Sequence, residues 1–296
     1  MPTLRLSLPL SAPRTSLLHS SRRFFSAGFS RLFPSCYPRE KLQRDCRRVQ
    51  LFLKTEVLLR SLSPRLRLFS RFYTRMDKNK AMVEYLQRYG VLRSDRVAEV
   101  MEMIDRALFV PKENPPYLDS PMPIGYNATI SAPHMHALCL ELLKDHLQPG
   151  MRALDVGSGS GYLTACFAMM VGPEGRAVGI EHIPELVAAS IENVKRSAAT
   201  PLLEKGSLSL HVADGRYGWP EAAPYDTIHV GAAAPEIPKA LLDQLKPGGR
   251  MVIPVGDLFQ DLQVVDKKLD GSIISRNETG VRYVPLTSRS AQLQNS

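Results

Sequence analysis

The sequence predicts an α/β fold, with a doubly wound, mostly parallel sheet of Rossmann-like type and a helical segment before it. The first observation is a glycine-rich turn at 157–161, which follows an apolar stretch and precedes a helical run over 162–171. Strand, glycine turn and helix in that order open many nucleotide sites. The second is a series of short apolar runs separated by helical spacers, as in parallel sheets that bind ligands at their carboxyl edge.

The spacing of the glycine turn favours one cofactor. Asp155 stands two residues before Gly157, and the turn continues through Ser158 and Gly159 as GxGxG rather than GxGxxG. The glycines allow positive φ and a close approach of ligand to backbone. A carboxylate here would repel a pyrophosphate but would suit an ammonium group. S-adenosylmethionine carries an ammonium, a sulfonium and no phosphate, so the sequence predicts this cofactor, with S-adenosylhomocysteine as product.

Acidic residues end two of the later apolar runs. Glu181 follows the first, where an acid would hold ribose hydroxyls. The alternative is a surface glutamate at the start of the next helix. Asp214, followed by Gly215, could accept from an adenine amino group. Strands are predicted over 176–180, 208–212, 225–231 and, after a turn at 245–250, over 251–255.

Charge divides the chain into two parts. Residues 1–75 carry 14 Arg and 2 Lys against three acids, a net charge of +13, so the overall +9 leaves −4 on residues 76–296. We therefore expect a basic, disordered leader at 1–75 and a globular domain at 76–296, which the predicted methyl-donor cofactor makes a methyltransferase domain. A mildly acidic domain argues against nucleic-acid binding.

The leader is rich in Arg and Ser and poor in acids, as transit peptides are, which predicts a mitochondrial or chloroplast protein. Alternatively, translation starts at Met76, or the leader is not a transit peptide, and the protein is cytoplasmic or nuclear. No run of 18 apolar residues is present, so no membrane span is expected. The four cysteines lack metal or redox spacing, and neither a metal site nor a disulfide is expected.

Two helices are predicted before the glycine turn, over 77–89 and 96–107, followed by a proline-rich irregular stretch. The inward residues expected on them are Met82, Val83, Leu86, Tyr89, Val97, Val100, Met101 and Ile104. Asn114-Pro115-Pro116-Tyr117 resembles a motif of amino-group methyltransferases. It does not follow an apolar strand, however, so a proline-stiffened loop is the better interpretation.

Ser131 stands at a predicted helix start that could bind a carboxylate. It is predicted to be an N-cap, with Pro133 in the first helical turn and the helix continuing over 137–147. A helix start offers free N–H groups to a carboxylate. The alternative is that Ser131 only caps. His134, His136 and His229 are expected to be structural rather than bases.

These motifs resemble those of the protein-L-isoaspartate (D-aspartate) O-methyltransferase family. The matching stretches are 128–136, 153–161, 228–235 and 283–287, within a similarity from about Met82 to Gln292. The resemblance implies transfer of a methyl group from S-adenosylmethionine to the free carboxyl of L-isoaspartyl and D-aspartyl residues in damaged proteins, which initiates repair. Glu181 stands where animal relatives often carry Asp, and it should still reach a ribose diol.

The resemblance also implies site residues and partners. Ser131 matches the active-site serine, and the partners are isoaspartyl proteins and peptides, with no nucleic acid, no membrane and a monomeric enzyme. The expected cofactor residues are Ala128, Thr129, Ile130, Ser131, Asp155, Gly157, Ser158, Gly159, Glu181, Asp214, Gly215, Thr287 and Gln292. The expected substrate residues are Ser131, Ala132, His134 and Val284. Two rival functions remain: another class I methyltransferase acting on RNA or a small molecule, and a non-enzymatic adaptor that binds isoaspartyl chains.

Overall fold

A computed structural model of the chain describes residues 78–294, so the predicted leader and its boundary at 75/76 lie outside the described residues. The chain begins there with a helix over residues 78–88. The further helices are α4 (Asp95–Met103), α5 (Pro133–Leu143), α6 (Tyr162–Val171), α7 (Pro184–Lys195), α8 (Thr200–Lys205), α9 (Lys239–Gln244) and α10 (Arg289–Gln294). The strands are β1 (Met122–Gly125), β2 (Ala128–Ile130), β3 (Arg152–Val156), β4 (Arg176–Glu181), β5 (Leu208–Val212), β6 (Tyr225–Val230), β7 (Leu245–Val255), β8 (Gln260–Lys267) and β9 (Ile273–Val281).

The central sheet has the order β5-β4-β3-β6-β7-β8-β9. Its first five strands are parallel, and β8 and β9 join them antiparallel. The predicted α/β class with a mostly parallel sheet is therefore confirmed. The chain leaves β3 toward β4 and β5 and then returns to the other side of β3 as β6. This reversal places the topological switch point, where ligands bind in such folds, between the ends of β3 and β6.

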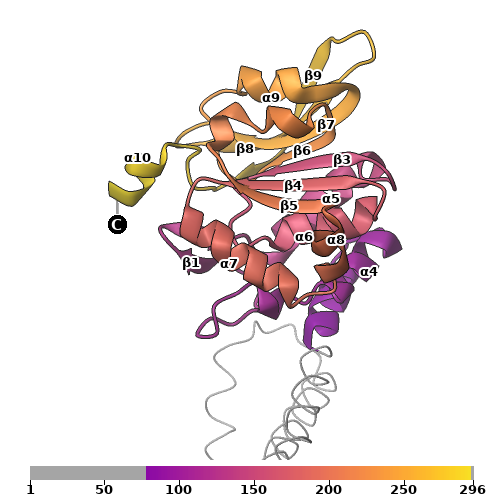
Figure 1. The fold of residues 1–296 in the computed structure, drawn as a ribbon, viewed down its shortest axis with the longest axis vertical. Coiled ribbons are helices and arrows are strands. Elements are labelled where there is room, and N and C mark those ends of the chain that lie inside the picture. The colour runs from indigo at the N-terminus through magenta and orange to yellow at the C-terminus, as the bar shows by residue number, and fades with distance from the viewer. Residues whose placement is uncertain (1–77, 295–296) are drawn as a thin grey trace, which may run out of the picture. The chain divides into compact units, whose positions relative to one another are not determined.

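Both faces of the sheet are covered. Successive strand residues point to opposite faces, so Ala153 packs in one apolar cluster and Leu154 in the other. The first cluster contains the buried sides of α4, α5 and α6, and the second contains Leu241 of α9. Figure 1 shows α4 to α8 on one side of the sheet and α9 on the other. Among the described residues, no helix combines the length and apolar character that crossing a membrane requires.

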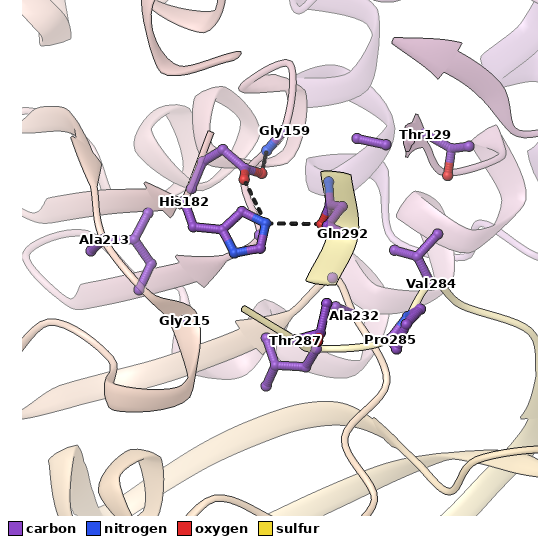
Figure 2. A pocket seen from close by; sticks show the side chains of 16 residues that line it. Thr129, Gly159, His182, Ala213, Gly215, Ala232, Val284, Pro285, Thr287 and Gln292 are labelled. Carbon is purple, nitrogen blue, oxygen red and sulfur yellow. Dashed lines mark hydrogen bonds and ion pairs between the residues drawn. The ribbon is translucent and has the colours of Figure 1, made fainter. Parts of the chain in front are cut away.

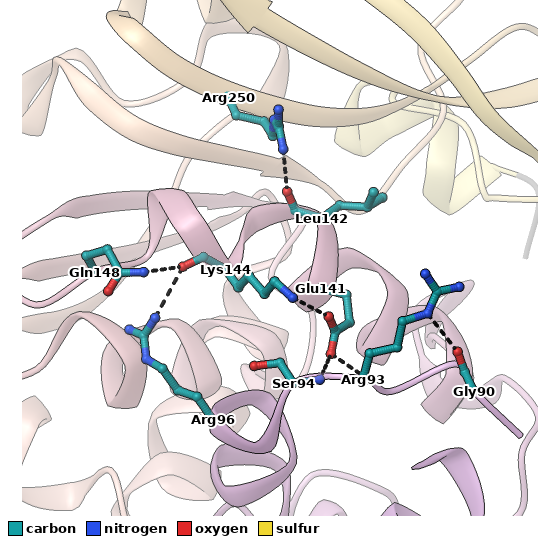
Figure 3. Close-up of polar contacts among 9 residues, drawn as sticks. All are labelled: Gly90, Arg93, Ser94, Arg96, Glu141, Leu142, Lys144, Gln148 and Arg250. Carbon is teal, nitrogen blue, oxygen red and sulfur yellow. Dashed lines mark hydrogen bonds and ion pairs between the residues drawn. The ribbon is translucent and has the colours of Figure 1, made fainter. Parts of the chain in front are cut away.

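Polar contacts join the N-terminal helical segment to the end of α5, as Figure 3 shows, and also to α6. One oxygen of the Glu141 carboxylate accepts from the backbone N–H groups of Arg93 at 2.9 Å and Ser94 at 2.7 Å. Arg96 donates to the carbonyls of Lys144, Leu147 and, at 2.8 Å, Met170. These carbonyls lie at or near helix ends, where the last C=O groups have no partner within the helix, so Arg96 satisfies them.

Several local predictions need correction. Tyr89 follows the end of helix 78–88 and is 67% exposed, although it was expected inside, whereas the other seven inward residues are buried. The N-cap of α5 is Ala132, not Ser131, and the helix starts at Pro133 and ends at Leu143. Residues 245–250 were expected to form a turn, but they are the first part of β7. The pairing of β6 with β7 shifts in register between Tyr225 and Thr227, which accommodates these extra residues in the strand.

Two further predictions concern loops and thiols. Residues 114–117 lie outside any helix or strand, as expected for a loop, and the Tyr117 hydroxyl donates to Asp105 at 2.9 Å. Cys139 and Cys166 are buried free thiols, as expected.

Strands β1, β2, β8 and β9 and helix α10 were not predicted. They include the segments that close the carboxyl edge of the sheet.

Candidate functional site

The glycine turn after β3 forms the floor of the candidate site. Gly157 and Ser158 donate their backbone N–H groups to the Ile180 carbonyl at 2.9 and 3.0 Å, which fixes the turn against β4. Gly159 has φ +51, and a Cβ there would lie 3.1 Å from the Ile124 side chain. A side chain would therefore strain the backbone and crowd β1, so the turn leaves its backbone open to a ligand.

A cavity of about 520 Å³ lies above this turn, at the switch point of the sheet. Part of this space is open to solvent, so the lining residues rather than its size indicate which ligand it takes. Nine of the predicted site residues line it, namely Ala128, Thr129, Gly157, Gly159, Glu181, Gly215, Val284, Thr287 and Gln292. The tertiary structure thus brings together five segments that are far apart in the sequence.

Glu181 lies at the end of β4 and is only 7% exposed. One carboxylate oxygen accepts from the Gly159 N–H at 3.3 Å, and the other accepts from the Ile183 N–H at 3.1 Å. Burial raises the pKa of this carboxyl, and the backbone donors only partly oppose that effect. Glu181 is therefore not a surface residue. A carboxylate has about four acceptor positions, so these backbone donors leave capacity for a hydroxyl of a vicinal diol in the cavity.

The C-terminal helix closes the cavity on one side. The Gln292 side chain hydrogen-bonds His182 at 2.8 Å and donates to the Tyr126 carbonyl at 2.8 Å. The Asn127 side chain donates to the Gln292 carbonyl at 2.9 Å. Figure 2 shows His182 pointing toward Gln292, with Thr129 and Val284 farther along the wall. Hydrogen bonds therefore join the β1–β2 turn to α10 beside the cavity.

Ser131 faces a second, broader cavity of about 1890 Å³ that merges with solvent. Its lining includes all four predicted substrate residues, Ser131, Ala132, His134 and Val284. The two cavities share Thr129, Gly231 and Val284 in their linings. The two cavities are therefore adjacent along these three residues.

Three side chains hold the Ser131 region in place. Arg106, which is fully buried, donates to the Ser131 carbonyl at 2.7 Å and to the Pro116 carbonyl at 2.9 Å. Burial lowers the pKa of this guanidinium to about 10. The Tyr283 phenol hydrogen-bonds the Ser131 side chain, and burial raises the pKa of Tyr283 well above its usual range. His134 at the start of α5 donates its backbone N–H to Asp119 at 2.9 Å.

Asp155 does not line the cofactor cavity. It is 2% exposed and pairs with the His229 Nδ1 at 2.9 Å, while its other oxygen accepts from the Thr164 hydroxyl at 2.6 Å. Burial alone would lower the pKa of His229, but Cys139 and the Asp155 carboxylate raise it to about 10. The pair joins β3 to β6 beneath the turn. Its carboxylate holds the floor of the site rather than facing a ligand.

Four more predicted cofactor residues lie outside the lining of this cavity, and one of them, Ser131, lines the broader cavity instead. Asp214 is engaged by Arg216, whose guanidinium lies 2.6 Å from its carboxylate, and only its neighbours Ala213 and Gly215 reach the cavity. Ile130 is buried in the core cluster. Ser158 is buried as well, and within residues 78–294 its hydroxyl has no hydrogen-bond partner.

Sequence reasoning missed several lining residues, chiefly His182, Gly231, Ala232 and Pro285. Gly231 is the last residue of a predicted strand and His182 follows Glu181 just past another, so their positions at strand ends could have revealed them. Arg106 carried no such signal, because its contact with Ser131 depends on how two distant segments pack. Within the described residues, no three His, Cys, Asp or Glu side chains are grouped to hold a metal ion.

Comparisons with known proteins agree with this geometry. Residues 77–291 match the family described as "Protein-L-isoaspartate(D-aspartate) O-methyltransferase (PCMT)". A protein-L-isoaspartate O-methyltransferase of Triticum aestivum is 79% identical over 75% of this chain and 96% of its own length. The Arabidopsis thaliana protein-L-isoaspartate O-methyltransferase 1 is 69% identical over 74% of this chain and 95% of its own.

A solved structure supports the same assignment. A putative protein-L-isoaspartate O-methyltransferase from Plasmodium falciparum, in complex with S-adenosyl-L-homocysteine, aligns with a TM-score of 0.65. It is 37% identical and covers 71% of this chain and 98% of that one. The family match covers more than half of the sequence, and the two plant relatives align over nearly their whole length. The chain therefore belongs to the protein-L-isoaspartate(D-aspartate) O-methyltransferase family.

Proposed function

We propose that this enzyme transfers a methyl group from S-adenosylmethionine to the free carboxyl of L-isoaspartyl and D-aspartyl residues in damaged proteins, which initiates their repair. The observation that carries this is the shared boundary at Thr129, Gly231 and Val284 between the cofactor cavity and the Ser131 cavity. A methyl donor and an acceptor carboxylate can meet only where the two cavities join. Ser131, which matches the active-site serine of the family, lines the second cavity beside that boundary.

The residues present fit the cofactor. The glycine turn provides an open backbone, Glu181 retains acceptor positions for a ribose diol, and Gln292 and Thr287 cover the cavity. S-adenosylmethionine supplies an electrophilic methyl group, and its transfer breaks a C–S bond and forms a C–O bond. S-adenosylhomocysteine and a methyl ester are the products.

The protein's task is to orient the acceptor. An aspartyl carboxyl is ionised at neutral pH, because its pKa is about 4, so no strong base is needed. The Ser131 hydroxyl, held by Tyr283, would hydrogen-bond the carboxylate. Arg106 fixes the Ser131 backbone through its carbonyl. Catalysis then depends mainly on proximity, orientation and exclusion of water.

A Ser131→Ala variant tests this assignment. Methyl transfer to an isoaspartyl peptide should fall far more than the affinity for S-adenosylmethionine, because the serine acts on the acceptor. Kinetics with labelled cofactor and calorimetry measure the two quantities. Equal losses in both would return Ser131 to a structural role.

A substrate panel separates the rival functions. Labelled S-adenosylmethionine is incubated with the enzyme and an isoaspartyl peptide, its normal aspartyl twin, a D-aspartyl peptide or an RNA pool. Label should enter the isoaspartyl and D-aspartyl peptides only. Labelled RNA would support the rival methyltransferase, and binding of the isoaspartyl peptide without turnover would support an adaptor.

The charge of −4 on residues 76–296 supports a protein substrate rather than nucleic acid. We further propose that the enzyme is a monomer, which light scattering tests, and that residues 1–75 direct it to mitochondria or chloroplasts. A fluorescent protein fused behind residues 1–75 should enter one of these organelles. A cytosolic signal would refute the transit function, and a nuclear signal would identify a nuclear-import segment.

A further inference from the structure

The turn between β7 and β8 exposes two large apolar side chains side by side in the sequence. Leu258 and Phe259 are each 94% exposed. Single exposed apolar residues are ordinary, but adjacent ones that rim a cavity are typical of binding sites. Leu269, in the β8–β9 turn, is 85% exposed and lines none of the three cavities at the carboxyl edge of the sheet.

The conformation of the β7–β8 turn fixes these side chains outward. Gly256 has φ +122, and a Cβ at this position would lie 2.0 Å from the Phe259 carbonyl oxygen. Its N–H donates to the Ala234 carbonyl at 2.9 Å, and the Gln260 side chain donates to the Asp257 carbonyl at 3.2 Å. These contacts hold the backbone of the turn that carries the exposed Leu258 and Phe259.

The same turn is connected to the floor of the Ser131 cavity. The Gln260 side chain accepts from the Tyr283 N–H at 2.6 Å and donates to the Tyr283 carbonyl at 3.1 Å. Tyr283 in turn hydrogen-bonds the Ser131 side chain. Leu258 and Phe259 line the Ser131 cavity, and Leu258 also lines a neighbouring cavity of about 1020 Å³. The apolar pair is therefore an outer part of the same wall.

We propose that Leu258 and Phe259 form an apolar platform that binds an apolar side chain flanking the isoaspartyl residue of the substrate. This rests on the proposed function. An isoaspartyl carboxylate at Ser131 belongs to a longer chain, and an extended chain advances only about 3.3 Å per residue. Its neighbouring residues must therefore pass along the cavity wall that these two side chains rim. Two aliphatic or aromatic groups without polar atoms can offer such a neighbour only apolar contact.

A positional peptide series tests the platform. Each peptide carries one isoaspartyl residue in a Gly/Ser background, and a single leucine is placed at one of the three positions on either side. Initial rates give kcat/KM for the wild type, for a Leu258→Ser/Phe259→Ser double variant and for the control Leu269→Ser. Cofactor affinity and thermal midpoint are measured for each enzyme.

The wild type should prefer leucine at one or two positions by about tenfold in kcat/KM. Partial burial of a leucine side chain that removes about 55 Å² of apolar surface from water corresponds to that factor at about 25 cal/mol per Å². The double variant should lose this preference while methylating the all-Gly/Ser peptide at the wild-type rate. Leu269→Ser should keep the preference. A wild type without positional preference, or a double variant that retains it or loses rate on every peptide, would overturn the platform. Failure of the wild type to methylate any isoaspartyl peptide would refute the proposed function itself.

Discussion

Replacing Glu181 by alanine should weaken S-adenosylmethionine binding by about 1–3 kcal/mol, which corresponds to a roughly 5- to 150-fold higher Kd. The carboxylate already accepts from Gly159 and Ile183, and it keeps acceptor capacity for a ribose hydroxyl. A hydrogen bond to a charged group contributes about 1.5–3 kcal/mol. In the variant, water can hydrogen-bond the ribose hydroxyls instead, so the net loss of binding free energy is smaller than the sum of the lost bonds.

The same substitution removes the acceptor of two backbone N–H groups. We therefore expect a lower unfolding temperature for Glu181→Ala, at about 2–4 °C per kcal/mol lost in a domain of this size. Glu181→Gln keeps an acceptor oxygen of the same reach and should be less destabilised. Glu174→Ala is the matched control, because that side chain is 82% exposed.

The assay is calorimetric titration of cofactor at several pH values, with thermal unfolding alongside. Burial raises the pKa of Glu181, and the cofactor should bind the ionised carboxylate. The Kd of the wild type should therefore rise as pH falls through that raised pKa, whereas the Kd of Glu181→Gln should stay flat. A folded Glu181→Ala enzyme with wild-type affinity, or a glutamine variant with the same pH dependence as the wild type, would refute this reasoning.

Three further predictions follow from single contacts. Arg106→Met should lower the unfolding free energy by about 2–4 kcal/mol in denaturant titrations, because the buried carbonyls of Ser131 and Pro116 lose their donor; a loss below about 1 kcal/mol would contradict this. Because the pKa of His229 is about 10 in the folded protein and about 6.5 in the unfolded chain, its protonation stabilises the fold fully below pH 6.5. The free energy of unfolding should therefore decline as pH rises toward 10, and His229→Gln should flatten that decline. Gln292→Ala should speed cofactor release about 2- to 12-fold in stopped-flow experiments, because the hydrogen bonds of Gln292 to His182 and Tyr126, which contribute about 0.5–1.5 kcal/mol, are lost. The control Gln294→Ala, at an exposed position, should have no effect.

The sequence by itself determined the layers of this protein. The strands at 176–180, 208–212 and 225–231 were predicted within one residue, because apolar runs bounded by turns have few alternatives to a buried strand. Glu181 and the glycine turn could be assigned for the same reason, since the carboxyl ends of parallel strands meet at one edge. The family motifs added Ser131, Thr287 and Gln292, which no periodicity indicates.

The tertiary structure decided what each polar residue does. Asp155 was expected beside the cofactor, but packing of β3 against β6 places His229 next to it, and a buried carboxylate pairs with the nearest base. Asp214 was likewise expected beside the cofactor, and in the structure it forms an ion pair with Arg216. The hydrogen bonds of Gln292 to the β1–β2 turn and the support of Ser131 by Arg106 join residues far apart in the chain. Local sequence patterns encode the period of a helix or strand, whereas these contacts depend on how complete elements pack, and only the folded chain decides that.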